Sequence, residues 1–329
     1  MKVGYSLSPG GLLYPYHIGV LTSLTYHDHL TPSHPIAGSS AGAIAVATHA
    51  AGIPPSKALE GTLRIASQAQ SMGGAPGNLL PLLEHELNDL LPENVAEELN
   101  ARPGTVGLAH YQLFPTPKPI LETYFETKAH VMDSICNSSM FPFFSTKFPC
   151  RLAKYSTVQS NGWPRVTVDG FFCVERDRFG CPDFHAISNS KEEGGGDDDD
   201  EKPNVVERTI TISVVPHESI ALTASDAQDQ ISPLPSLDTT KQMTQLIRLA
   251  TSSETTRKDY TNLYENGWMD AERWIKEEEE RQGRSGSGKK STTMRRELYG
   301  RALLGEEWWK KLMEEEQQLE EKDTFGDWN

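Results

Sequence analysis

A glycine-flanked serine constrains this chain of 329 residues more than any other segment: Gly38-Ser39-Ser40-Ala41-Gly42. It follows a short apolar stretch and leads into the small-residue run at 43–47. This order is typical of a strand that turns sharply into a packed helix, where only residues with almost no side chain fit beside an exposed hydroxyl. The helix would begin at Ala41 and direct its positive end toward the group that Ser40 attacks. The segment therefore predicts a nucleophilic serine at a strand-to-helix turn.

A second glycine turn lies upstream of this serine. Residues 3–8 have the pattern of a first strand, and Pro9-Gly10-Gly11 interrupts it before a helix expected from about Tyr16 to Leu24. A glycine turn at the start of a helix leaves backbone N–H groups without intrahelical acceptors. We therefore expect Gly10 and Gly11 to donate hydrogen bonds to an oxyanion, with the N–H of Ala41 as a third donor.

A carboxylate follows much later, at the end of the β-branched segment 166–168. Asp169 directly precedes Gly170, and an Asp-Gly pair by itself is most often an ordinary turn. Its place after a glycine turn and a serine turn gives it more weight, because a serine nucleophile needs a base.

These three segments, in this order, resemble the patatin-like phospholipase family, and within it the branch of animal adiponutrin and adipose triglyceride lipase. The resemblance covers roughly residues 3–276. The segments that carry it are 6–20 around the glycine turn, 38–43 around the serine, 136–144 before the Asp-Gly pair, 209–216 and 231–233 after it, and 264–271.

The resemblance implies a three-layer α/β/α fold with a central, mostly parallel sheet. Carried over residue by residue, it places the nucleophile on Ser40 and the catalytic aspartate on Asp169, and it requires no histidine. Asp169 would take the proton of Ser40 directly, and an acyl-enzyme would follow. A carboxylate with an ordinary pKa near 4 is a weak base for an alcohol, so burial has to raise the pKa of Asp169.

The activity that the resemblance implies is hydrolysis of carboxylic esters of glycerolipids. Triacylglycerol is the first expected substrate, and phospholipid hydrolysis or acyl transfer on the same site are close alternatives. Neither a cofactor nor a metal is implied. We expect the protein to be cytoplasmic and to contact lipid droplets or membranes peripherally, because no stretch of the chain reaches transmembrane length.

Two residues depart from the family pattern and motivate an alternative class of function, although Gly10 and Gly11 are retained. Pro9 has no N–H to donate, and Tyr14 adds bulk where the family has a glycine. A catalytically weak protein that binds lipid surfaces or regulates other proteins is therefore the alternative to an enzyme.

A Ser-His-Asp triad is the alternative chemistry on the same serine. Chain order would then require His185 or His217 as the base. Neither histidine has a motif around it, so the sequence favours the dyad.

Composition excludes some partners. The net charge of −15 disfavours nucleic acid, since phosphate-binding surfaces need clustered Lys and Arg. The four cysteines lack metal-ligand spacing, and reduced thiols are expected although Cys173 and Cys181 could pair.

Several aromatic side chains could contact lipid, with core packing as the alternative. They are Phe141, Phe143, Phe144, Trp163, Phe171 and Phe172.

The chain divides by composition into a hydrolase domain and a tail. The domain is expected at 1–276, with a disordered acidic insertion at 188–204. Residues 277–329 form a charged linker and a helical tail whose apolar stripe could dock on the core or on a protein partner.

Overall fold

The computed structural model describes residues 2–155, 163–184, 206–220, 227–252 and 255–283, together with Gly305 and Lys310. The acidic insertion expected at 188–204 lies outside the described residues, as do His185 and nearly all of the tail beyond residue 283.

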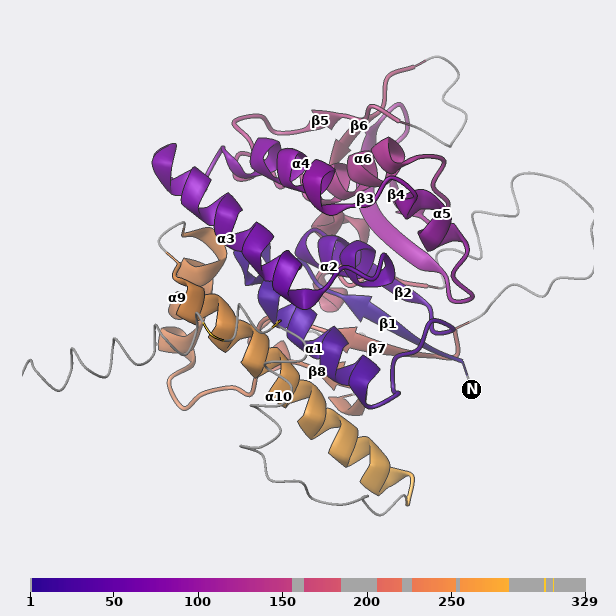
Figure 1. Ribbon diagram of the computed structural model, residues 1–329, viewed down its shortest axis with the longest axis vertical. Helices are drawn as coiled ribbons and strands as arrows, with labels where there is room; N and C mark the ends of the chain where they lie inside the picture. Colours follow the sequence, from indigo (N-terminus) through magenta and orange to yellow (C-terminus); the bar gives the residue numbers. More distant parts are fainter. Residues whose placement is uncertain are drawn as a thin grey trace, which may run out of the picture.

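A mixed sheet forms the centre of the fold (Figure 1). Its strand order is β5-β6-β3-β2-β1-β7-β8, and β4 pairs with β3. Neighbours from β3 through β2, β1 and β7 to β8 are parallel, whereas β4, β5 and β6 join antiparallel on the β3 side. The expected α/β class with a mostly parallel sheet is therefore confirmed. The strands are β1 (Val3–Leu7), β2 (Ile36–Ser39), β3 (Val106–Phe114), β4 (Lys118–Glu122), β5 (Arg151–Leu152), β6 (Val166–Val168), β7 (Arg208–Ile212) and β8 (Gln230–Ile231).

The longer helices gather on one face of this sheet (Figure 1). Helix α2 packs on β2 and β3, α6 packs on β3, and α10 packs along α1. The helices are α1 (Tyr14–Tyr26), α2 (Ala41–Ala50), α3 (Pro55–Ser71), α4 (Leu79–Leu90), α5 (Val95–Asn100), α6 (Lys128–Ser138), α8 (His217–Ile220), α9 (Thr239–Thr251) and α10 (Arg257–Arg281), with 3-10 turns η1 (Gly11–Leu13), η2 (Gly170–Cys173), η3 (Arg176–Arg178) and η4 (Ala227–Asp229).

The two faces of the sheet differ because side chains alternate along each strand. Tyr5, Leu7 and Ile36 belong to the main apolar core under the helices. The opposite face carries small residues such as Gly4, where an added Cβ would lie 2.9 Å from the ring of Phe184. Oγ of Ser6, on the same face, donates to the carbonyl oxygen of Pro182 at 2.7 Å, so the segment around Pro182 and Phe184 covers this face.

Helices α1 and α10 cross at backbone contact. An added Cβ at Gly267 would lie 2.1 Å from the carbonyl oxygen of Tyr16. We expect Gly267→Ala to destabilise the fold by about 1–3 kcal/mol or more, because backbone on both sides has to move. The measurement is Tm, which should fall by roughly 2–4 °C per kcal/mol. Asn266→Ala, at an exposed position of the same helix, is the control and should leave Tm almost unchanged; equal Tm values for the two variants would contradict the close crossing.

Helix α10 crosses the domain boundary expected at residue 276 and continues to Arg281. Its residue Glu278 accepts a hydrogen bond of 2.5 Å from Nη1 of Arg208, and Arg208 also bonds Asp229 at 2.6 Å. Chiefly because Arg208 donates to it, the pKa of Glu278 is lowered to about 2. The glutamates at 277–280 are thus part of a helix that is tied to β7.

Within the described ranges, no helix has both the length and the apolar character needed to cross a bilayer. Cys136, Cys150, Cys173 and Cys181 are free thiols, so Cys173 and Cys181 do not pair.

Candidate active site

Ser40 lies between the last residue of β2 and the first residue of α2, as the glycine-flanked motif predicts. Its φ of 52° and ψ of −119° are unfavourable for a residue with a side chain, which is typical of a strained nucleophile turn. Gly38 and Gly42 allow this turn, because an added Cβ at Gly38 would lie 2.3 Å from the backbone of Gly42.

Asp169 follows β6 and is completely buried. Its Oδ1 accepts the N–H of Phe171 at 2.8 Å, which fixes the carboxylate at the start of η2. The next residue, Gly170, packs directly on the neighbour of Ser40: an added Cβ there would lie 2.8 Å from Oγ of Ser39. The fold therefore brings Asp169 beside Ser40, although the two are far apart in the sequence.

The carboxyl group of Asp169 has a strongly altered pKa. Burial raises this pKa from 3.8 to about 7, and the Phe171 N–H and the side chain of Ser40 lower it only in part. Oδ2 has no partner at normal hydrogen-bond distance among the described residues. Burial is the main reason that the pKa of the Cys173 thiol is raised to about 12, and the nearby charge of Asp169 raises this pKa further. Asp169 thus has the pKa of a general base for neutral pH.

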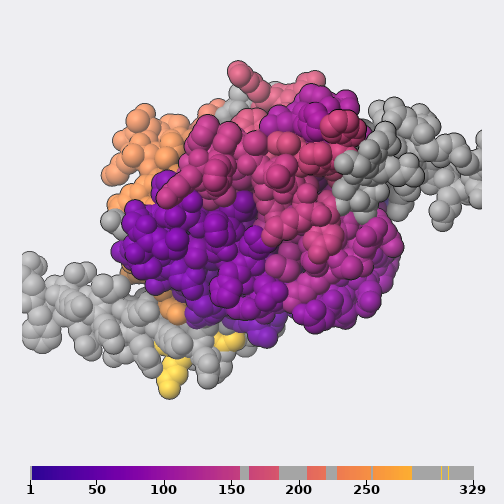
Figure 2. Space-filling model, turned by 90° about the horizontal axis from the view of Figure 1, so that it is seen from above, coloured from indigo at the N-terminus to yellow at the C-terminus, as the bar shows by residue number. Residues whose placement is uncertain are grey.

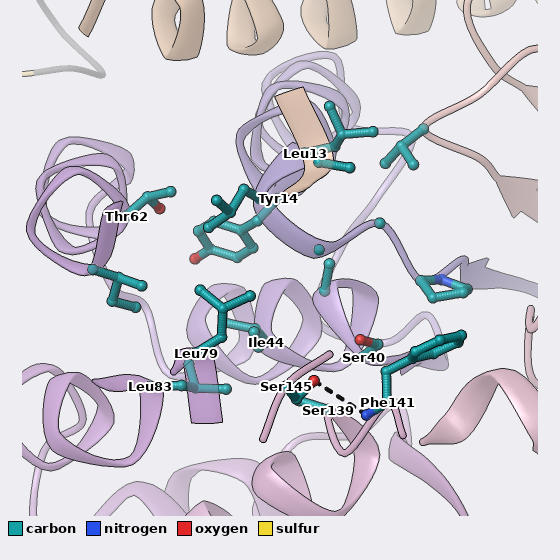
Figure 3. A pocket seen from close by; sticks show the side chains of 18 of the residues that line it. Leu13, Tyr14, Ser40, Ile44, Thr62, Leu79, Leu83, Ser139, Phe141 and Ser145 are labelled. Atoms are coloured by element: carbon teal, nitrogen blue, oxygen red, sulfur yellow. Dashed lines mark hydrogen bonds between the residues drawn. The ribbon is translucent and has the colours of Figure 1, made fainter. Parts of the chain in front are cut away.

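Ser40 opens into a cavity of about 520 Å³ (Figure 3). Gly10, Gly11 and Ala41 line the same cavity. The three expected donors are thus placed together with Ser40, on the two loops that follow β1 and β2.

A buried histidine holds the glycine loop. His17 on α1 donates from Nε2 to the carbonyl oxygen of Ser8 at 2.8 Å. Burial lowers the pKa of His17 to about 4, so the ring is neutral at pH 7 and its proton is on the nitrogen that faces the carbonyl. No sequence signal singles out His17, since a lone histidine in a helical pattern does not reveal its role.

Tyr14 does not form part of the glycine turn itself. It is the first residue of α1, and its hydroxyl is 2.9 Å from Oγ1 of Thr48. Its ring lines the cavity and projects between α2 and α3, as Figure 3 shows. The Tyr14 ring therefore forms part of the cavity wall and does not replace a residue of the glycine turn.

The cavity walls are mostly apolar and come from helices α3, α4 and α9. Seen from above, residues 55–100, the 130–180 region and α9 adjoin on one side of the molecule (Figure 2). Leu79 and Leu83 of α4 and Leu246 and Ala250 of α9 line the cavity. One charged wall residue, Glu86, is neutralised by Arg64, which donates to it at 2.5 and 3.0 Å.

Helix α9 was missed by the sequence analysis. The apolar spacing of Met243, Leu246, Ile247 and Ala250 is the signal that could have revealed it. None of its residues is fully buried, yet its last turn lies on the glycine loop: an added Cβ at Gly11 would be 2.8 Å from the carbonyl oxygen of Ala250.

The six aromatic candidates separate into two groups. Phe141, Phe144 and Phe171 line the cavity. Phe143, Trp163 and Phe172 do not line it, and their exposed fractions are 67%, 59% and 41%.

The histidine of the alternative triad is bound elsewhere. Nδ1 of His217 lies 2.9 Å from Oγ of Ser232, and His217 is not among the residues that line the cavity. His185 lies outside the described residues. Of the two histidines, the one that the structure describes is therefore not placed at the cavity that Ser40 lines.

The family model for patatin-like phospholipases matches residues 5–173, which is more than half of the chain and includes both Ser40 and Asp169. The chain belongs to the patatin-like phospholipase family. Members of this family are lipid hydrolases, namely esterases and phospholipases. The match begins in β1 and ends in η2, so it spans both loops of the candidate site.

Among solved structures, the crystal structure of VipD from Legionella pneumophila is similar to this patatin-like chain at 9% sequence identity, with a TM-score of 0.40. The similarity covers 84% of this chain and 67% of the VipD chain. No curated protein sequence matches the chain.

Proposed function

We propose that this patatin-like protein hydrolyses carboxylic esters of glycerolipids with Ser40 as nucleophile and Asp169 as base. The observation that carries the proposal is a buried carboxylate beside a strained serine at the wall of an apolar cavity. A buried base with a pKa of about 7 next to a nucleophile is the combination that acyl transfer at neutral pH needs.

The proposed reaction has two stages. Asp169 takes the proton of Ser40 while Oγ attacks the ester carbonyl, and the carbonyl electron pair moves onto oxygen. Collapse of this intermediate breaks the ester bond, and Asp169 returns the proton to the departing alcohol. Asp169 then activates a water molecule, which releases the fatty acid and restores the Ser40 hydroxyl.

The oxyanion would be stabilised by the N–H groups of Gly10, Gly11 and Ala41. Such donors act strongly in a site from which water is excluded. The N-terminus of α2 adds a positive dipole end at the same point. Pro9 contributes no N–H, but the two glycines after it supply the donors of this loop.

The cavity suits the acyl part of a lipid. Its volume of about 520 Å³ and its mostly apolar walls give room and an apolar environment for a hydrocarbon chain. We propose triacylglycerol or phospholipid as the substrate, reached by peripheral contact with a droplet or membrane surface.

Labelling with a fluorophosphonate probe across pH 5–9 tests the proposal. We expect covalent modification of Ser40 whose rate rises as pH passes through about 7 and then levels off, because Asp169 acts as a base only when ionised and its pKa is about 7. His217→Ala is the control and should keep both rate and midpoint.

Loss of labelling in His217→Ala would contradict the dyad and support a Ser-His-Asp triad with His217 as the base. Wild-type protein that is not labelled but still binds neutral-lipid emulsions would favour the lipid-binding alternative.

A further inference from the structure

The backbone N–H of Ser40 lies between strand β2 and helix α2, so it has an acceptor neither in the sheet ladder nor in the helix. The β2–β3 ladder ends with the pair Ser39 and Ala109, and α2 begins at Ala41. The N–H donates instead to Oγ of Ser138 at 2.8 Å. Ser138 is the last residue of α6 and is completely buried. A side chain far away in the sequence thus holds the strained nucleophile residue.

The same end of α6 also holds the segment that carries Asp169. The N–H of Asp169 donates to the carbonyl oxygen of Met140 at 2.9 Å, two residues after Ser138. Oγ1 of Thr167 donates to Oδ1 of Asn137 at 3.1 Å. Both loops of the proposed dyad are therefore attached to residues 137–140.

Helix α6 is itself firmly fixed. Oγ1 of Thr127 caps its N-terminus by accepting the N–H of His130 at 3.1 Å. Nη1 of Arg151 bonds Oδ1 of Asp133 at 2.6 Å and also bonds Asn137. Oδ2 of Asp133 accepts the N–H groups of Lys154 and Tyr155 at 2.8 and 2.9 Å. Since Asp133 and Asn137 are buried and hydrogen-bonded to Arg151, the end of α6 has little freedom to shift relative to the sheet.

We propose that Ser138 is a positioning residue: its hydroxyl fixes the Ser40 backbone, so that the C-terminal end of α6 sets the distance between Ser40 and Asp169. This inference rests on the proposed function for its catalytic consequence. It goes beyond that function because Ser138 would touch neither the ester nor the oxyanion.

Ser138→Ala is the direct test. We expect the rate of fluorophosphonate labelling to fall by about 10–100-fold, because small displacements of reacting groups have effects of this size. The midpoint of labelling should also move to higher pH, since the side chain of Ser40 lowers the pKa of Asp169 and would lie farther from it. Thr167→Val, which loosens the Asp169 segment from the same helix, should slow labelling by a smaller factor.

Ser23→Ala is the matched control. Ser23 is also a completely buried serine on a helix, and its hydroxyl has no hydrogen-bond partner among the described residues. It should keep the wild-type rate and midpoint. Hydrogen exchange of fragments that span residues 36–44 gives a readout independent of activity, and it should be faster in Ser138→Ala only.

The outcomes separate the two proposals. Wild-type rate and midpoint in Ser138→Ala would overturn the positioning role. Wild-type protein that is never labelled would overturn the proposed function, and the exchange measurement alone would then decide: unchanged exchange at 36–44 overturns the Ser138 contact, and faster exchange supports it.

Discussion

Ser40→Ala is expected to abolish covalent labelling of this patatin-like protein and to lower its ester hydrolysis by a factor of about 10³ or more. The reason is that, within the part of the chain that the structure describes, Ser40 is the serine that combines the strained turn, the cavity wall and the adjacent buried carboxylate. Without its Oγ no acyl-enzyme can form, whereas the cavity and the N–H donors are unchanged. Labelling and hydrolysis of a long-chain ester are measured on the same preparation.

Ser33→Ala is the control for this change, since Ser33 is an exposed serine in the loop before β2. It should be labelled like the wild type. Labelling that survives in Ser40→Ala would place the reactive group on another residue and would contradict the proposed nucleophile. Hydrolysis that survives without labelling would show that water attacks the ester directly.

Asp169→Asn is expected to lower labelling by about 10³-fold and, at the same time, to stabilise the protein at pH 8. An amide cannot take the proton of Ser40, which accounts for the lost activity. The gain in stability has a separate cause. With a pKa of about 7, the completely buried carboxylate is charged at pH 8, and burying this charge lowers the stability of the folded state. The amide of Asn carries no charge, so this cost is absent.

The sign of this second effect follows from proton linkage. Between about pH 4 and pH 7, Asp169 is protonated in the folded wild-type protein but ionised in the unfolded chain. Because the folded state binds more protons in this pH range, the stability of the wild type falls as pH rises through it. Asn does not titrate. The difference in free energy of unfolding between Asp169→Asn and wild type should therefore grow from pH 4 to pH 8, and reach on the order of a few kcal/mol.

Urea unfolding at pH 4, 6 and 8 measures this difference. Asp89→Asn, at an exposed carboxylate of α4 that pairs with the equally exposed His85, is the control and should differ little from wild type at each of the three pH values, because exposed charges contribute little to stability. A stability difference for Asp169→Asn that stays constant with pH would mean that Asp169 is not a buried group with a raised pKa.

The parts of the site that the sequence predicts are those encoded by a few adjacent residues. Ser40 could be found because its turn requires glycines on both sides, and Gly10 and Gly11 could be found because a glycine turn precedes a helix. The α/β class was expected from the resemblance to the patatin-like family that these turns carry. Asp169 was a weaker prediction, since an Asp-Gly pair by itself is an ordinary turn, and it gained weight from the order of segments that the patatin-like family shares.

Other features of the site are set by contacts between segments that are distant in the sequence. One wall of the cavity is formed by α9, whose residues show a helical pattern but no sign of what they contact. The pKa of Asp169 depends on burial, which no local pattern records. Residues 138 and 139 are both serines, so the sequence does not distinguish them, yet it is Ser138 whose Oγ accepts the N–H of Ser40.

Thus the sequence by itself determined which residues are candidates for the proposed chemistry, because a sharp glycine-flanked turn, a glycine turn before a helix and an Asp-Gly pair are local properties of the chain. The tertiary structure decided how they act together: which carboxylate lies beside Ser40, how far its pKa rises, and what surrounds the cavity. These properties depend on distances between segments and on exclusion of water, and both arise only when the sheet and its helices have packed.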